Sequence, residues 1–279
     1  MRPLGELADP APPRVVYVDL DGTLLGPGGS LFASEGGGVT RRAADAVAAL
    51  LEAGGELVPL SGRTAVQVRE TARLVGALAY IGELGGVTCY EPGGEIVRDF
   101  GAFAGAGTPH EAMVRGGVGG LLLENFPGRL EPHDPWAFLE RECSMLLRGH
   151  VEVAEVEAAL DRWGFGWLHV TDNGVIRREY EGLRTEEVHA YHVLPRGVTK
   201  AAAAAADMAR RGIPPERCVA IGDSPADAAL SAVCGAAFIV ANGREDVARG
   251  GLDRPNLFAT DAPYGDGFAE AIMRLLGRA

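Results

Sequence analysis

Short apolar runs alternate with longer segments of helical periodicity in the first third of the chain. The apolar runs are four or five positions long and the first is rich in β-branched residues, which is typical of strands buried on both faces of a parallel sheet. Thr40 is placed to cap the first helical segment, and Gly54 and Gly55 are placed to end it. Strands are expected at residues 14–18, 56–60 and 79–82, and helices at 40–53 and 65–75. This alternation predicts an α/β sheet.

The same alternation returns after residue 191. Thr199 is expected to cap a helix that Gly212 ends. Ser224 and Pro225 have the residue types of an N-cap and a first helical position, so a further helix should open there. The expected elements are a helix at 200–210, strands at 218–222 and 236–240, and a C-terminal helix at 267–276.

The segment between these two regions has a different pattern and contains all three tryptophans. Residues 150–163 carry an apolar stripe at helical spacing, and residues 165–170 alternate as a strand does. Asp172-Asn173-Gly174 is a strong signal for a tight turn. We therefore predict two domains, with residues 87–190 inserted into a domain built from 1–86 and 191–279. Residues 1–13 are expected to form a loose leader.

Composition and charge narrow the function. The 279 residues are 47% hydrophobic, enough for a sizeable core, and the formal net charge is −12. A strongly acidic chain disfavours nucleic acid and anionic membranes as partners, but it can bind a small phosphorylated molecule through a metal or a few local cations. The four scattered cysteines fit a reduced, cytoplasmic protein, and no apolar stretch suits a signal peptide or a bilayer span. A monomer or homodimer is expected.

Candidate chemistry begins where the first strand ends. Asp19 and Asp21 project to the same side at its carboxyl end, which is where open parallel sheets bind ligands. Two carboxylates this close repel each other unless a cation lies between them, and Mg²⁺ with its oxygen ligands is the natural partner. The alternative is an ordinary surface turn after a strand, because Asp and Gly are common there.

Three later positions could complete such a site. Asp223 and Asp227 follow the strand at 218–222 and lie one helical turn apart, although acidic residues also simply favour helix N-termini. Ser61 follows the strand at 56–60, where its hydroxyl and nearby N–H groups could hold a phosphate oxygen, or merely cap the next helix. Lys200 stands in the first turn of a helix, where the dipole disfavours a cation, so it indicates an anionic partner or a solvated lysine.

Taken together, four segments resemble the motifs of the haloacid-dehalogenase superfamily of phosphohydrolases. They are D-L-D-G-T-L-L from Asp19, L-S-G-R-T around Ser61, R-G-V-T-K ending at Lys200, and G-D-S-P-A-D ending at Asp227. The insertion lies between the second and third motifs, as does the type IIB cap of the Cof-like branch, which includes mannosyl-3-phosphoglycerate phosphatase and sucrose-phosphatase. The resemblance implies a Rossmann-like core with a parallel sheet and an inserted α/β cap domain.

The resemblance also implies roles for individual residues. Asp19 would be the nucleophile that forms an aspartyl-phosphate, and Asp21 the general acid and base. Ser61 and Lys200 would bind the phosphoryl oxygens. Mg²⁺ would be held by Asp19, the backbone carbonyl of Asp21 and Asp223, with Asp227 in support. The remaining substrate-binding positions are Leu20, Gly22, Thr23, Gly62 and Arg63. Two residues depart from the family pattern, Ala226 before the last Asp and Ala201 after the lysine.

These features predict a Mg²⁺-dependent hydrolase of a small phosphorylated metabolite. The branch resemblance favours a sugar phosphate, such as a phosphorylated disaccharide or mannosyl-3-phosphoglycerate. A sugar phosphomutase and a non-catalytic phosphosugar-binding regulatory protein are the alternatives. The cap is expected to select the substrate, and its candidate residues are Glu91, His133, Trp136, Arg148, His150, Asp172 and Asn173. The glycine-rich run 116–120 lacks the spacing of a nucleotide site.

Overall fold

The computed structural model describes residues 1–8, 11–91, 94–176, 180–185 and 187–278. The chain divides into two compact units. Unit 1 comprises Met1–Val97 and Lys200–Ala279, and unit 2 comprises Arg98–Thr199. The sequence placed these boundaries after residues 86 and 190. They differ because the strand after residue 86 pairs within unit 1, whereas the strand that begins at His189 pairs within unit 2.

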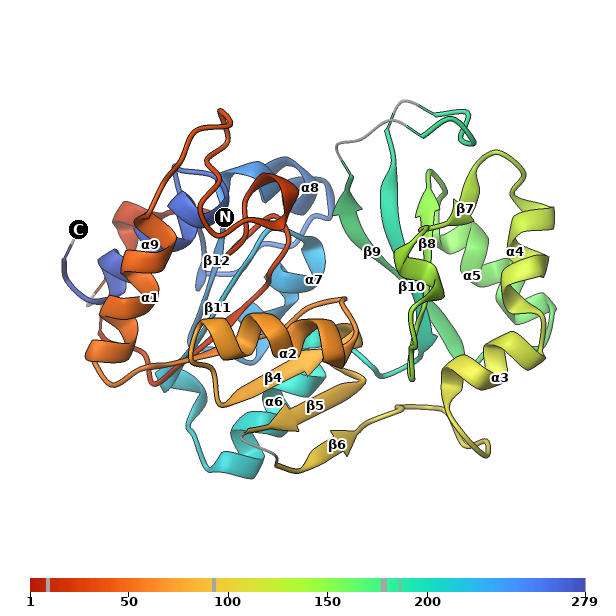
Figure 1. Cartoon of the computed structure of the whole chain (residues 1–279), viewed down its shortest axis with the longest axis horizontal. Coiled ribbons are helices and arrows are strands. Elements are labelled where there is room, and N and C mark those ends of the chain that lie inside the picture. Colours follow the sequence, from red (N-terminus) through yellow and green to blue (C-terminus); the bar gives the residue numbers. More distant parts are fainter. Residues whose placement is uncertain (9–10, 92–93, 177–179, 186, 279) are drawn as a thin grey trace. The chain divides into compact units, whose positions relative to one another are not determined.

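Unit 1 is built on a six-stranded sheet in the order β1-β13-β12-β11-β2-β3, in which every pair is parallel. The central strands are β2 (Val15–Val18) and β11 (Cys218–Gly222). Their residues are almost all buried, as the continuous apolar runs predicted. The outer strands are β1 (Arg2–Pro3), β3 (Glu56–Pro59), β12 (Ala236–Ile239) and β13 (Leu257–Ala259). The predicted α/β class with a parallel sheet is confirmed (Figure 1).

Helices cover both faces of this sheet, because alternate residues of each strand point to opposite sides. Val16 and Val18 pack in one core with α1 (Arg42–Glu52), α2 (Ala65–Leu74) and α9 (Tyr264–Leu275). Val15 and Tyr17 pack in the other core with α6 (Lys200–Arg211), α7 (Pro225–Ala228) and α8 (Arg244–Arg249). A small three-stranded sheet of β4 (Ala79–Gly82), β5 (Val87–Tyr90) and β6 (Ile96–Arg98) completes the unit.

Unit 2 has a four-stranded antiparallel sheet in the order β7-β8-β10-β9. Its strands are β7 (Leu130–Pro132), β8 (Met145–Gly149), β9 (Leu168–Val175) and β10 (His189–Pro195). The helices α3 (Pro109–Arg115), α4 (Val118–Asn125) and α5 (Val153–Arg162) supply the other side of its apolar core. The predicted stripe on α5 is confirmed at its centre, where Val156, Ala159 and Leu160 are buried.

Three local predictions were wrong. Asp172-Asn173-Gly174 makes no hairpin turn but lies inside β9, at a register shift against β10, because pairing with a long central strand outweighs the local turn preference. The leader is not loose, since β1 pairs with β13 and Leu4 is buried. Thr40 is not the N-cap of α1. That position is Arg41, while the Thr40 hydroxyl accepts from the Arg42 N–H and donates to Asp266.

Candidate active site

The carboxyl ends of β2 and β11 lie side by side in unit 1. Val18 pairs with Ile221, and the Asp19 N–H donates to the Ile221 carbonyl oxygen at 3.0 Å. Because both strands run in the same direction, the two residues that follow them, Asp19 and Asp223, emerge at the same edge of the sheet. The sequence placed each of these residues at a strand end, and the sheet order brings the two ends together.

A buried ion cluster occupies this edge. The carboxylates of Asp19, Asp223 and Asp227 offer oxygen atoms that lie within 4.8 Å of one another. The Nζ atom of Lys200 lies 2.7 Å from Asp19 Oδ1 and 2.7 Å from Asp227 Oδ1. The side chain of Lys200 is only 1% exposed. The cation that is unfavourable at a helix start is therefore held by two carboxylates, which explains why it is tolerated there.

Lys200 is the one lysine among the 26 Lys and Arg residues of the sequence. A compact ammonium group can bridge two carboxylates from inside a buried cluster, whereas the planar guanidinium of Arg needs more room. Every other basic position in the chain is Arg, so composition distinguishes residue 200 from all of them.

Asp227 is fixed by the start of α7. Ser224 is the N-cap and Pro225 takes the first helical position, as the sequence predicted, and Asp227 also completes a capping box with Ser224. Asp227 Oδ2 accepts from the backbone N–H of Ser224 at 3.1 Å, and Oδ1 accepts from Lys200. Since both oxygens already have donors, Asp227 is suited to hold Lys200 and the loop in place.

Asp223 is oriented by two neighbours, one of which the sequence did not indicate. Thr23 Oγ1 donates to Asp223 Oδ1 at 3.1 Å, and Asn242 Nδ2 lies 3.2 Å from Oδ2. Asn242 also donates to the Gly22 carbonyl oxygen at 2.9 Å and accepts from the Tyr264 N–H at 2.8 Å. It thus ties the turn after β2, Asp223 and the start of α9 together. Nothing in the spacing of the A-N-G segment signalled this role.

The turn after β2 depends on glycine. Gly22 has φ +86°, and a Cβ atom at this position would lie 2.0 Å from Asp223 Oδ2. Any other residue would therefore strain the backbone and displace the carboxylate. Leu20 and Thr23, which the family resemblance also assigned to substrate binding, are both buried. Leu20 packs in the apolar core, and Thr23 is fully buried against Asp223.

Asp21 lies apart from the buried cluster and pairs with Arg63. The Arg63 Nε atom lies 2.6 Å from Asp21 Oδ2, and its Nη2 atom contacts Oδ1, which makes a two-point contact between segments 42 residues apart. Asp21 is about half exposed. Ser61 is buried and its hydroxyl oxygen accepts from the Arg63 N–H at 3.2 Å, so the segment containing Gly62 is folded tightly beside Asp21.

Sequence comparison finds known proteins that resemble this chain. A family model described as haloacid dehalogenase-like hydrolase matches residues 178–249, which include Lys200, Asp223 and Asp227. A curated phosphoglycolate phosphatase of Natronomonas pharaonis is 29% identical over 258 residues, which cover 92% of this chain and 95% of that protein. Residues 178–249 therefore match the haloacid dehalogenase-like hydrolase family, and the similarity to that phosphatase extends over almost the whole chain.

Solved structures of the superfamily share the fold. Sucrose-phosphatase of Synechocystis sp. PCC6803, in complex with sucrose and phosphate, superposes with a TM-score of 0.62 at 15% identity, over 94% of this chain and 98% of that one. A subclass IIB sugar phosphatase of the superfamily gives 0.61 at 17% identity, over 95% and 100%. At these identities the solved structures show a shared fold, and the phosphoglycolate phosphatase is the relative that resembles this chain in sequence over almost its whole length.

The carboxylate oxygen atoms suit this site to a hard divalent cation. Three carboxylates lie close together and one ammonium group contacts two of them, so these four side chains carry an excess of negative charge. Burial raises the pKa of Asp19 to about 7, with Lys200 lowering it and Asp227 and Asp21 raising it. Burial, Asp19 and Asp227 likewise raise the pKa of Asp223. Such a donor set fits Mg²⁺, and Asp19 and Asp223 are the carboxylates that would hold it.

The raised pKa of Asp19 predicts a pH dependence of stability. An Asp in an unfolded chain titrates near 3.9, so between about pH 4 and pH 7 the folded protein binds more protons than the unfolded chain. The free energy of unfolding of the metal-free protein should therefore fall as the pH rises through this window. Urea unfolding is measured across this pH range with EDTA and again with excess Mg²⁺. The free energy of unfolding should fall less with rising pH when Mg²⁺ is present. Equal slopes in both series would contradict this account.

The residues proposed to line the cap do not form one group. Glu91 lies in unit 1, where it accepts from Arg69 Nε at 2.9 Å. Arg148 lies over the Tyr180 ring and pairs with Glu131, and Trp136 is half exposed. His150 and Asp172 both lie beside His189. His133 and Asn173 also lie in unit 2.

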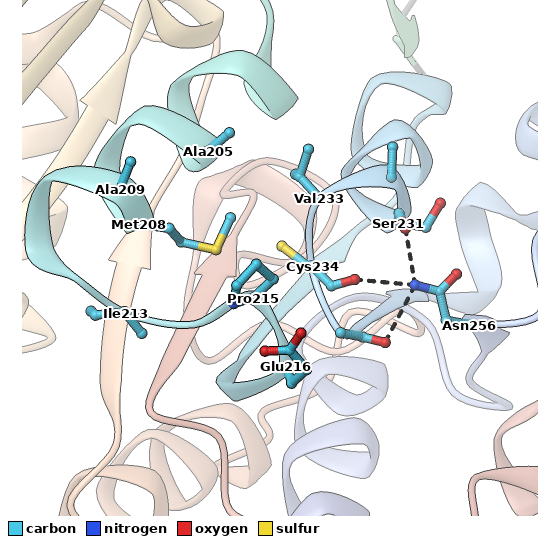
Figure 2. Close-up of a pocket in the computed structure, with 12 residues that line it drawn as sticks. Ala205, Met208, Ala209, Ile213, Pro215, Glu216, Ser231, Val233, Cys234 and Asn256 are labelled. Carbon is cyan, nitrogen blue, oxygen red and sulfur yellow. Dashed lines mark hydrogen bonds between the residues drawn. The ribbon is translucent and has the colours of Figure 1, made fainter.

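A surface hollow of about 570 Å³ in unit 1 is separate from the acidic cluster. Its lining comes from α6 and the residues after it, from the segment after α7 and from Asn256, and none of the cluster carboxylates contributes to it. Figure 2 shows Asn256 Nδ2 donating to carbonyl oxygens of Ser231, Cys234 and Gly235, which fixes the loop that forms one wall. The hollow is mainly apolar, so it does not suit a phosphate group.

Proposed function

We propose that the chain is a Mg²⁺-dependent phosphomonoester hydrolase that acts on a small phosphorylated metabolite through an aspartyl-phosphate on Asp19. The observation that supports this proposal most strongly is the buried cluster of Asp19, Asp223, Asp227 and Lys200 at the carboxyl ends of β2 and β11. An attacking carboxylate, a cation beside it and an oxygen-ligand set are what phosphoryl transfer requires.

The chemistry divides into two displacements. In the first, Asp19 attacks phosphorus, the bond to the leaving oxygen breaks, and protonated Asp21 gives its proton to that oxygen. In the second, ionised Asp21 takes a proton from water, the resulting hydroxide attacks phosphorus, and the bond to Asp19 breaks to release inorganic phosphate. Lys200 donates to Asp19 Oδ1, which orients the carboxylate and stabilises charge on the phosphoryl group. Mg²⁺, when bound by Asp19, Asp223 and the Asp21 carbonyl, supplies charge neutralisation between carboxylate and phosphate.

Arg63 has two parts in this scheme. Its contact with Asp21 holds the carboxylate in one orientation, but Asp21 must leave that contact to pass a proton to the substrate. The guanidinium then becomes available to an anionic group of the substrate, and Arg is well suited to bind phosphate or carboxylate at two points. Ser61, buried beside Arg63, would take a phosphoryl oxygen.

Two substrate classes have support. The type IIB resemblance and the sugar phosphatases among the structural neighbours favour a sugar phosphate, such as a phosphorylated disaccharide or mannosyl-3-phosphoglycerate. The curated relative that matches almost the whole chain is named a phosphoglycolate phosphatase, which favours a short phosphorylated carboxylic acid. Unit 2, as the inserted cap, is proposed to choose between them. Sugar phosphate remains the first candidate.

Phosphate release from a substrate panel tests the proposal. The panel contains sugar phosphates, mannosyl-3-phosphoglycerate, phosphoglycolate, nucleotides and phosphopeptides, each with Mg²⁺ and with EDTA. We expect release with Mg²⁺, strong loss with EDTA, and the highest kcat/KM for a sugar phosphate. Preference for phosphoglycolate would move the substrate to the second class, and preference for nucleotides or phosphopeptides would refute both. Turnover without phosphate release would indicate a phosphomutase, and binding without turnover a regulatory protein.

The cellular compartment of this activity is also a proposal. Cys89, Cys143, Cys218 and Cys234 are all free and buried, which fits a reducing compartment such as the cytoplasm. In the part of the chain that the structure describes, no helix is both long and apolar enough to cross a membrane. Monomer or homodimer stays a prediction.

A further inference from the structure

Two histidines and two carboxylates converge in unit 2, independently of the acidic cluster in unit 1. His150 directly follows β8, His189 begins β10, and Glu187 lies just before β10. One ligand atom from each of these three residues lies within 4.8 Å of the other two. Asp172 approaches from β9. The strands β8, β10 and β9 are consecutive in the sheet, so the grouping follows from strand pairing (Figure 1).

His189 is the centre of the cluster. Its Nε2 atom lies 3.0 Å from Glu187 Oε1, and its Nδ1 atom lies 2.8 Å from Asp172 Oδ2. The ring stacks on Tyr191, and the side chain is 11% exposed. Burial lowers the pKa of His189, but the two carboxylates outweigh it and raise the pKa to about 9. The surroundings of this ring therefore attract positive charge.

His150 directly follows β8, which pairs with β10 on the side opposite β9. Its ring meets that of His189 edge-on, with ring centroids 5.5 Å apart and planes at 79°. His150 is exposed, so its ring can rotate at little cost. Ligand atoms around a tetrahedral zinc ion lie roughly 3.4 Å apart, as follows from metal–ligand distances of about 2.1 Å. Binding would therefore require the exposed ring of His150 to rotate so that the three donors, now within 4.8 Å of one another, reach this spacing.

We propose that His150, His189 and Glu187 bind a divalent transition metal ion of the zinc class, with Asp172 orienting His189 through Nδ1. Two imidazoles and one carboxylate are a common zinc donor set, and nitrogen donors favour zinc, cobalt and nickel over magnesium. A carboxylate on the far nitrogen of a liganding histidine is the usual outer partner at such sites. The three protein ligands leave a further coordination position for water or an anion.

The two clusters differ in donor type, and this makes the inference testable apart from catalysis. Asp19, Asp223 and Asp227 offer only oxygen, which suits Mg²⁺. The cluster in unit 2 offers two nitrogens, which suit a softer ion. Excess Mg²⁺ should therefore fill the first site and leave the second free for a transition metal.

Titration of the untagged protein with Co²⁺, in excess Mg²⁺, tests the inference. We expect one equivalent to bind, with a visible absorption typical of nitrogen-coordinated Co²⁺, and Zn²⁺ to displace it. His150→Ala, at an exposed position, should abolish this absorption, as should His189→Ala. Asp172→Asn should weaken binding about 10–100-fold. His110→Ala, which removes a histidine of the same unit outside the cluster, should change nothing.

Two results would overturn the inference. One is the absence of any Co²⁺ signal in the unchanged protein. The other is a signal that persists in the His150→Ala variant, because the ion would then be bound elsewhere. Circular dichroism shows whether the His189→Ala variant is folded. If that variant is unfolded, the result for His150→Ala decides the test, because position 150 is exposed. Equal binding by the His110→Ala and unchanged proteins distinguishes the cluster from general histidine binding.

Discussion

Replacing Asp19 with Asn is expected to lower the rate of phosphate release by at least about 10⁴-fold, because losing a covalent nucleophile removes the reaction route itself. The substitution changes one oxygen to nitrogen and so keeps the shape of a side chain that is only 5% exposed. It also removes a buried negative charge whose pKa is already raised by burial. The folded state should therefore persist while the chemistry fails.

The measurement is steady-state phosphate release with Mg²⁺, together with urea unfolding of each variant. Asp45→Asn is the matched control, because Asp45 is an exposed aspartate of α1 in the same unit with no contact to the cluster. It should keep full activity. If Asp19→Asn retained activity within about tenfold of the unchanged protein, Asp19 would not be the nucleophile.

Replacing Lys200 with Met should damage both stability and catalysis. The ammonium group lies 2.7 Å from each of two buried carboxylates, and removing one partner of a buried ion pair typically costs about 3–5 kcal/mol. Loss of a positioned cation beside the reacting phosphoryl group should also lower kcat by roughly 10²–10³-fold, as found for other stabilising donors. Added Mg²⁺ should restore part of the stability, because it binds the folded state only.

Arg211→Met separates the two effects. Arg211 pairs with buried Asp207 at 2.7 Å in the same unit, so its loss should cost stability in a similar way without touching the cluster. Urea midpoints and kcat are measured for both variants, with and without Mg²⁺. Both should be less stable, and only Lys200→Met should lose kcat. A Lys200→Met protein with unchanged midpoint and kcat would remove Lys200 from the proposed mechanism.

The order of the elements and the acidic residues of the site could be predicted from the sequence because their signals are local. Asp19 follows an unbroken apolar strand, and Ser224 with Pro225 has the chemistry of a helix start, so neighbouring residues alone place Asp19 and Asp227 at element ends. The position of Lys200 could be inferred in the same way, from a cation in the first turn of a helix.

Other features depended on residues far apart in the sequence, and only the tertiary structure decided them. Asn242 reaches Asp223 because the loop after β12 lies beside the loop after β11, and Arg63 reaches Asp21 across 42 residues. Asn173 and Gly174 became part of a strand because pairing with β10 outweighed their turn preference. The His150 and His189 cluster likewise exists only because β8 and β10 are neighbours. Local chemistry determined which residues could act, and strand order decided which of them meet.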